Sequence, residues 1–340
     1  MDLITQGILG AAVSQAGFQK TLGRRALAWG AIAGMIPDMD VFVRLSSNPF
    51  AEMLYHRGIT HSLWFGPVLG PIFGYLVWKW YQRKGFSDPL SSWIGLMIWA
   101  LITHPLLDVF TIYGTQLLAP FSNHRFTIPA IAIVDPVYSL TLLAAICVGY
   151  FFHKRQTLVT ISASIALTLT SAYLFFGLAQ NEKAEKLCRT AIQATGENPL
   201  ISIKAYPTMF QLFLRRLVVE DPDKIRVGFV STWSPRQILW ETLEKPKNLP
   251  SFDFLNDPEV EIFKWFTSGQ YAIIYEPLSH QITINDTRFG FRGPSAFGLW
   301  GIRFQIDQQG NKAGPIERVK YPIGTITGRS IIKLFQETFD

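Results

Sequence analysis

Histidines and aspartates stand in pairs at metal-ligand spacing in the N-terminal third of the chain. The pairs are Asp38 with Asp40, His56 with His61, and His104 with Asp108. The last two residues are four positions apart, which places an imidazole and a carboxylate on one face of a helix. Imidazole together with carboxylate suits zinc, and also manganese or iron. These residue types at this spacing predict a site for a divalent metal ion.

Each pair alone also has a structural alternative. A carboxylate after a proline can cap a helix, two interfacial histidines can bond lipid headgroups, and an imidazole with a carboxylate can form a buried structural hydrogen bond. Three such pairs are harder to explain in this way, because ionisable groups in apolar segments are costly and suggest a functional site. Asp135, which precedes Pro136, is expected to cap a helix. Cys147 and Cys188 are expected to be structural.

The elements that carry these pairs are apolar enough to cross a membrane. A bilayer core needs about 20 apolar residues in a helix. Four runs meet this length, at 62–81, 93–112, 131–152 and 157–179. Two weaker runs lie at 3–18 and 26–43, and the second is broken by Pro37. We expect about six transmembrane helices.

The charge of the chain divides it into two parts. Residues 1–179 hold 11 Lys/Arg and 7 Asp/Glu, whereas residues 180–340 hold 20 and 18. We therefore expect an all-α membrane domain at 1–179, followed by a mixed α/β, mainly antiparallel soluble domain at 180–340. The net charge of +6 is spread over both parts and is no nucleic-acid footprint. Strands are predicted at 225–232, 271–275, 281–284 and 298–306, and helices at 180–195, 208–217 and 256–266.

Lysine and arginine are unevenly shared between the connections of the membrane part. The connections at 19–25, 79–90 and 153–156 hold eight of them, and those at 44–61 and 113–130 hold three. The positive-inside rule makes the first set cytoplasmic. The C-terminal domain is then extracytoplasmic, and nearly all acids and histidines of the membrane part lie at the outer ends of spans.

Taken in order, the motifs resemble those of a known family. They are Met1-Asp2, Thr5-Gln6, Pro37-Asp38-Met39-Asp40, His56-Arg57-Gly58-Ile59-Thr60-His61-Ser62, His104-Pro105-Leu106-Leu107-Asp108, Thr111 to Thr115, Pro120-Phe121-Ser122 and Asp135-Pro136 with Tyr138. The chain resembles the YdjM family of bacterial inner-membrane proteins, which are described as metal-dependent hydrolases. The resemblance is dense over residues 1 to about 140.

The resemblance implies a helical metal-binding core, distantly similar to zinc-dependent phospholipase C and P1-type nucleases. Carried onto this chain, it implies one set of metal ligands: Asp38, Asp40, His56, His61, His104 and Asp108. Asp2 is a further, weaker candidate. Family members often carry histidine where this chain has Gln6; if that histidine is a ligand in them, one coordination position is weakened or replaced here.

The implied ligand set leads to hydrolytic chemistry. A bound ion lowers the pKa of a water molecule and polarises a phosphoryl or carbonyl oxygen. We expect Asp38, Asp40 and Arg57 to be catalytic: a carboxylate accepts the proton of the water, and the guanidinium stabilises a phosphate oxygen. Arg57 is also compatible with a headgroup anchor. Thr60 and Thr111 are expected to orient ligands.

Two functions follow for a multi-pass protein of the bacterial inner membrane. The first is a membrane-embedded, metal-dependent hydrolase that acts on a phosphoester or another lipid or envelope substrate. The second is a non-catalytic scaffold with a structural metal site, which presents its soluble domain to protein partners. The expected partner in either case is the lipid bilayer, and no nucleic acid is expected.

Overall fold

The structure, a computed structural model, describes residues 1–196, 202–249, 251–290, 298–320 and 328–339. The described chain divides into two compact units. One consists of residues 1–46 and 55–176, and the other of residues 47–54 and 177–340. Each unit is described by itself below.

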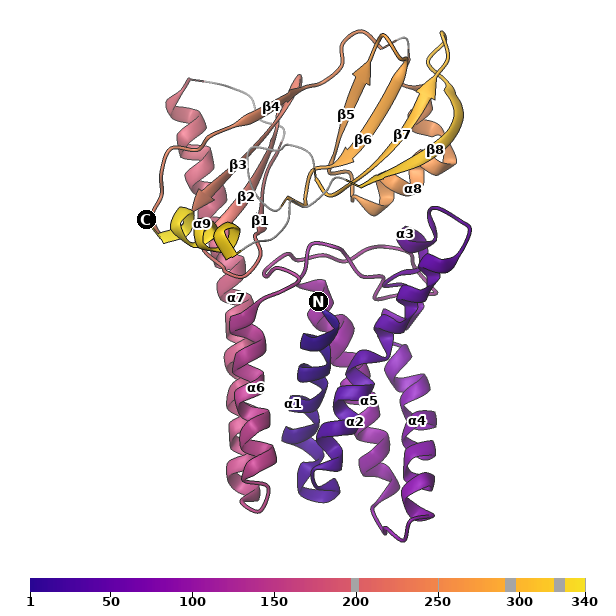
Figure 1. The fold of residues 1–340 in the computed structure, drawn as a ribbon, viewed down its shortest axis with the longest axis vertical. Helices are drawn as coiled ribbons and strands as arrows, with labels where there is room; N and C mark the ends of the chain where they lie inside the picture. Colours follow the sequence, from indigo (N-terminus) through magenta and orange to yellow (C-terminus); the bar gives the residue numbers. More distant parts are fainter. Residues whose placement is uncertain (197–201, 250, 291–297, 321–327, 340) are drawn as a thin grey trace. The chain divides into compact units, whose positions relative to one another are not determined.

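The first unit is helical (Figure 1). Its helices are α1 (Leu3–Leu22), α2 (Arg25–Met35), η1 (Pro37–Leu45), η2 (Ile59–His61), α4 (Phe65–Gln82), α5 (Leu90–Val109), α6 (Pro136–Phe151) and the first part of α7 (Gln156–Ala194). Asp135 caps α6 by accepting from the Tyr138 amide at 3.0 Å, as predicted. Tyr173 of α7 donates to the same carboxylate, so this cap also joins two helices.

Three segments among the described residues are long and apolar enough to cross a membrane. They are Arg25–Leu45, Leu90–Val109 and Gln156–Ala194. The predicted span at 62–81 does form α4, but its three glycines, two prolines and several Trp and Tyr residues lower its mean hydropathy. The run at 131–152 contributes only the 16-residue α6. The helical region is therefore shown with three candidate spans rather than six.

Small residues let α1 and α2 approach closely. A Cβ placed on Gly10 would lie 2.2 Å from the carbonyl oxygen of Gly30, and one on Gly34 would lie 2.5 Å from the carbonyl oxygen of Gln6. Such separations are shorter than any van der Waals contact, so side chains there would push the helices apart. The packing fixes the end of α2, which precedes Asp38.

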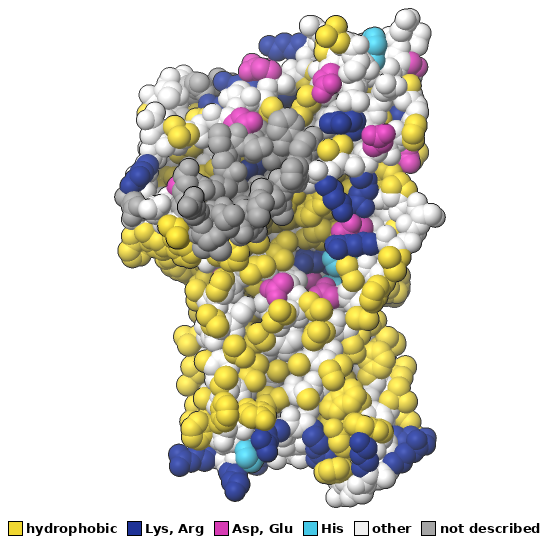
Figure 2. All heavy atoms as spheres, in the orientation of Figure 1, with side chains coloured by type: hydrophobic (Ala, Val, Ile, Leu, Met, Phe, Trp, Pro, Cys, Tyr) yellow, Lys and Arg dark blue, Asp and Glu magenta, His cyan; other side chains and the backbone are white. Residues whose placement is uncertain are grey.

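Basic side chains gather at one end of the helical unit. The turns between α1 and α2, α4 and α5, and α6 and α7 lie at this end, opposite the N-terminus (Figure 1). Figure 2 shows the Lys and Arg side chains clustered there, beyond a largely hydrophobic band. Arg25 pairs with Asp88 there, with two N–O distances of 2.8 and 2.9 Å.

The second unit contains two antiparallel sheets. The strands of the first are β1 (Ser202–Pro207), β2 (Leu214–Glu220), β3 (Lys224–Ser231) and β4 (Glu241–Glu244), in sequential order. Those of the second, also in sequential order, are β5 (Tyr271–Glu276), β6 (Gln281–Asp286), β7 (Trp300–Ile306) and β8 (Lys312–Lys320). The helices of this unit are α3 (Ala51–Tyr55), the end of α7, η3 (Asp253–Asn256), α8 (Pro258–Phe266) and α9 (Gly328–Phe339).

All four predicted strands of this unit are present, but the helix predicted at 208–217 is wrong. Leu214 to Glu220 instead form β2, the strand between β1 and β3, which is buried along nearly all its length. A short apolar run has no periodicity that separates a buried strand from a buried helix. The predicted helix at 180–195 is the continuation of α7, which is unbroken for 39 residues.

A segment of eight residues joins the second unit although its neighbours in sequence belong to the first. Residues 47–54 carry Glu52, whose carboxylate lies 2.9 Å from the guanidinium of Arg318 on β8. Arg318 also donates to the carbonyl oxygen of Pro49 at 3.1 Å. Two hydrogen bonds thus attach this segment to the second sheet.

Candidate metal centre

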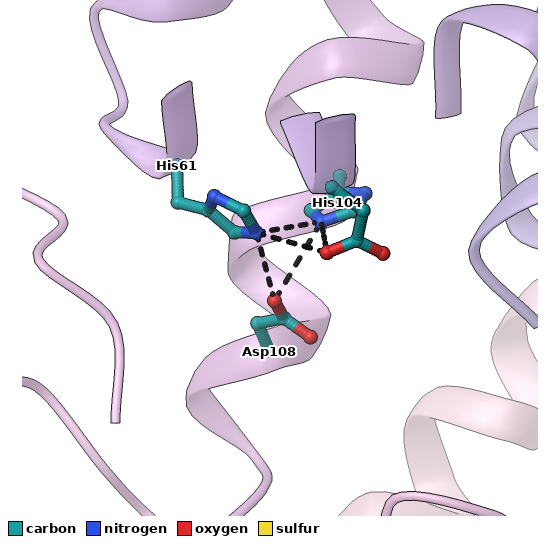
Figure 3. Close-up of side chains that lie close together, drawn as sticks. His61, His104 and Asp108 are labelled. Atoms are coloured by element: carbon teal, nitrogen blue, oxygen red, sulfur yellow. Dashed lines mark hydrogen bonds and ion pairs between the residues drawn. The ribbon is translucent and has the colours of Figure 1, made fainter. Parts of the chain in front are cut away.

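Four of the six predicted ligands converge at one point in the helical unit. They are Asp38, His61, His104 and Asp108, and their ligand atoms all lie within 4.8 Å of one another. Helix α5 supplies the last two residues, one turn apart, while η1 and η2 supply the others. Figure 3 shows His61, His104 and Asp108 pointing toward one another.

The separations fit a bound metal ion. The two Nε2 atoms of His61 and His104 are 3.0 Å apart, and His61 Nε2 is 3.3 Å from both Asp38 Oδ1 and Asp108 Oδ2. From His104 Nε2 the same two oxygens are 3.5 and 3.6 Å away. Four tetrahedral ligands about 2.1 Å from zinc would lie about 3.4 Å from each other. The donor set therefore fits a divalent ion in both chemistry and spacing.

The backbone of α2 orients one of the imidazoles. Nδ1 of His104 lies 2.6 Å from the carbonyl oxygen of Gly34, a bond that requires the proton on Nδ1 and leaves the Nε2 lone pair for the cluster. Pro105 follows His104 inside α5 and removes one backbone donor of that helix. Nothing in the sequence pattern identifies a carbonyl oxygen, so sequence reasoning missed Gly34.

The two oxygens of Asp108 have separate partners. Oδ1 accepts from the Gln6 amide at 3.0 Å and from the amino group of Met1. Oδ2 is buried, lies 3.1 Å from Nε of Arg57, and accepts no hydrogen bond of good geometry from the described residues. This second oxygen faces the two histidines, in a position from which it could bind a metal ion.

Asp40 and His56 form a separate pair beside the cluster. His56 Nδ1 lies 2.5 Å from Asp40 Oδ1, while Asp40 Oδ2 accepts from the Arg57 amide at 3.0 Å and from the Thr60 hydroxyl at 2.7 Å. The same oxygen is 3.2 Å from Nδ1 of His61. Asp40 thus touches the far side of one ligand, whereas His56 lies outside the group of four.

Arg57 is turned toward the protein. Its side chain is buried, and it donates to the Thr111 hydroxyl at 2.8 Å beside its ion pair with Asp108. The guanidinium also lies over the ring of Tyr113, 5.0 Å from its centroid. Its backbone is in the left-handed region, with φ of 60°. These contacts favour a role in placing Asp108.

Asp2 lies outside the group of four. It caps α1, accepting from both the amide and the hydroxyl of Thr5. Gln6, four residues further on, is the residue of α1 that reaches the site: besides Asp108 it donates to the carbonyl oxygen of His104 at 3.2 Å.

The surroundings of the two histidines in the loop before α4 shift their pKa values in opposite directions. Burial alone lowers the pKa of His61, but hydrogen bonds with Asp108, Asp38 and Asp40 outweigh it and raise that pKa to about 10. For His56 burial is the dominant effect, and its pKa is lowered even though Asp40 is bonded to it. A metal ion requires the neutral imidazole, so an ion binding at His61 displaces its proton.

Residues 1–184, which include the whole cluster, match the YdjM inner membrane protein family. The chain belongs to the YdjM inner membrane protein family. It is similar to the uncharacterized protein YfhP of Bacillus subtilis (strain 168), with 33% identity over 117 residues, or 34% of this chain and 33% of that protein. It is also similar to the inner membrane protein YbcI of Escherichia coli (strain K12), with 33% identity over 112 residues, or 32% of this chain and 62% of that protein.

The YdjM match places this chain among inner membrane proteins and says nothing of a reaction. The chain spans less than two thirds of the length of either relative. No solved structure matches it.

Proposed function

We propose that this YdjM-family protein is a membrane-embedded, metal-dependent hydrolase that acts on a phosphoester or another lipid or envelope substrate. The observation that carries the proposal is the group of two imidazoles and two carboxylates at tetrahedral separations. A divalent ion held there, zinc or else manganese or iron, would activate a water molecule and polarise the bond to be cleaved.

Asp38 is the most exposed member of the group of four. The side chain of Asp38 is 13% exposed, whereas those of His61, His104 and Asp108 are fully buried. We propose that a substrate approaches the cluster from the side of Asp38. Asp38 is both a ligand and the carboxylate nearest to an incoming water, which supports a catalytic role for it.

We propose that Asp40 and Arg57 support the group of four without belonging to it. Asp40 holds the loop that carries His56 and His61 through its bonds to Thr60 and the Arg57 amide. We propose that the Asp40–His56 pair takes up the proton of the attacking water. Asp40 is bonded to Nδ1 of His56, which leaves Nε2 of that imidazole to accept the proton. Arg57 would help to hold Oδ2 of Asp108 in place for a bound ion.

The active side is proposed to be extracytoplasmic. The basic turns at the opposite end of the helical unit are the side that the positive-inside rule assigns to the cytoplasm. Helix α7 leaves from that end, so the second unit would follow on the outer side.

A metal-dependent assay tests the proposal. The full chain, purified in detergent, is assayed on a water-soluble phosphodiester and on phospholipid, with and without added zinc or manganese. Turnover that needs metal and is lost in His104→Ala supports the hydrolase. Asp38→Asn is a milder variant that keeps the side-chain volume.

The second candidate is a scaffold with a structural metal site. It is favoured by the presence of four protein ligands, since structural zinc sites are closed by four whereas catalytic ones keep a position for water. Protein that retains stoichiometric metal but is inert on every substrate would establish the scaffold instead.

A further inference from the structure

An apolar groove runs along the helical unit between α2 and α4. Its volume is about 280 Å³, and its floor is Met97 of α5. The walls are Trp29, Ile32 and Ile36 on one side and Phe73, Leu76, Val77 and Trp80 on the other. Spacings of three and four residues place each set on one helix face. Among the described residues, no charged side chain lines the groove.

The groove leads toward the metal centre. Ile36 is two residues before Asp38, and Gly34, whose carbonyl oxygen orients His104, lies just before it. On α5, Met97 precedes His104 by seven residues, so the groove floor and the ligands lie on one stripe of that helix, about 10 Å apart along its axis.

The groove is open to the surface that faces hydrocarbon. It lies against two of the candidate spans, Arg25–Leu45 and Leu90–Val109. Ile32, Leu76 and Trp80 on its rims are 47%, 56% and 45% exposed, and the helical unit is largely hydrophobic on the face drawn in Figure 2. In a bilayer the neighbours of such side chains are lipid tails.

The dimensions select the occupant. The wall from Trp29 to Ile36 is about 10 Å long at 1.5 Å per residue. A groove of this length and about 280 Å³ suits a flexible hydrocarbon chain, which in a bilayer is already the surrounding solvent.

We propose that this groove binds an acyl chain of a membrane phospholipid whose phosphate lies at the metal centre. This inference rests on the proposed function only for the position of the phosphate. It adds a substrate class to that function: a phosphoester attached to a long alkyl chain. Hydrolysis would then favour long-chain over water-soluble phosphoesters.

A photocrosslinking experiment tests the groove without relying on turnover. The full chain is reconstituted in nanodiscs that contain phosphatidylglycerol with a diazirine in the middle of one acyl chain, and labelled peptides are identified by mass spectrometry. Leu76→Trp fills the groove from one wall and Ile32→Trp from the other. Leu169→Trp on α7 is the control, because Leu169 is 56% exposed, like Leu76, but lies outside the groove.

The inference predicts labelling concentrated on peptides from α2, α4 and the Met97 region. This labelling should fall about tenfold in both groove variants, because the indole ring takes the place of the acyl chain, and should not change in the control. Equal labelling in all variants, or labelling spread evenly over the helices, would overturn it.

Turnover separates this inference from the proposed function. The groove variants should keep their activity on a water-soluble phosphodiester and lose it on phospholipid. Groove labelling without turnover on any substrate supports the lipid site and refutes the hydrolase. Turnover with equal labelling in all variants refutes the groove alone.

Discussion

The two oxygens of the buried carboxylate of Asp108 face different neighbours. One oxygen is held by α1 and the other is left toward the histidines beside Arg57. Sequence spacing identified Asp108 because it interrupts an apolar run. It did not reveal that Gln6 and Arg57 both serve this one side chain.

The first prediction concerns the charge of that carboxylate. Asp108→Asn should abolish metal binding and destabilise the metal-free protein by about 3–5 kcal/mol, because Arg57 would remain as an uncompensated buried charge. Metal content and thermal unfolding in detergent measure both effects. Asp88→Asn is the matched control: it breaks the more exposed pair with Arg25 and should cost about 0–1 kcal/mol. Similar losses in the two variants would contradict this account.

The second prediction concerns the amide that holds Asp108. Gln6→Ala should weaken metal affinity by about 10- to 100-fold, the range seen when a partner of a ligand is removed. Gln15→Ala, on the same helix, removes hydrogen bonds to Ala145 and Val159 and should lower stability while leaving the affinity unchanged. Titration of the metal-free protein with zinc compares the two. Unchanged affinity in Gln6→Ala would mean that Gln6 does not orient the ligand.

At the level of elements, the cluster depends on how α2 ends. A 3₁₀ segment begins at Pro37, and residues two apart in such a segment point in different directions. This is why Asp38 reaches the histidine pair while Asp40 turns to His56 and Thr60. The sequence showed two carboxylates two residues apart, but the spacing alone could not assign them to different places.

The third prediction tests the close approach of α1 and α2. Gly10→Ala should destabilise the protein by about 1–3 kcal/mol and weaken metal binding, because the new methyl group meets the carbonyl oxygen of Gly30 and displaces α2. Gly17→Ala is the control on the same helix. It meets nothing within 4 Å and should stabilise by about 0.5–1 kcal/mol. Thermal unfolding and zinc titration distinguish them. If Gly10→Ala behaved like Gly17→Ala, the two helices would not be in contact as described.

At the level of the whole molecule, charge counting was the most informative part of the sequence. It separated a helical part from a part with two antiparallel sheets, and it grouped the three basic turns that the structure gathers at one end. Apolar length alone predicted more spans than hydropathy supports, because α4 is rich in glycine, proline and aromatic residues. The buried strand β2 was mistaken for a helix because its pattern has no clear period.

The fourth prediction fixes the orientation of the chain. Alkaline phosphatase fused after Asp340 should be active, and green fluorescent protein fused there should be dark, because the basic turns retain the other end in the cytoplasm. A fusion after Lys84, in the turn between α4 and α5, should give the reverse pattern. Fluorescence after Asp340 would instead place the second unit, and the side assigned to the metal centre, on the cytoplasmic side.

The eight residues at 47–54 have a thermodynamic consequence. They are anchored by Arg318 in the second unit, yet in sequence they connect Asp40 to His56. Folding of the second unit orders these residues, so less conformational entropy is left to lose when the loop that carries His61 is ordered around a metal ion. Metal affinity and folding of the second unit are therefore linked: Arg318→Ala should weaken zinc binding although Arg318 touches no ligand, and zinc should in turn protect the amides of β8 from hydrogen exchange.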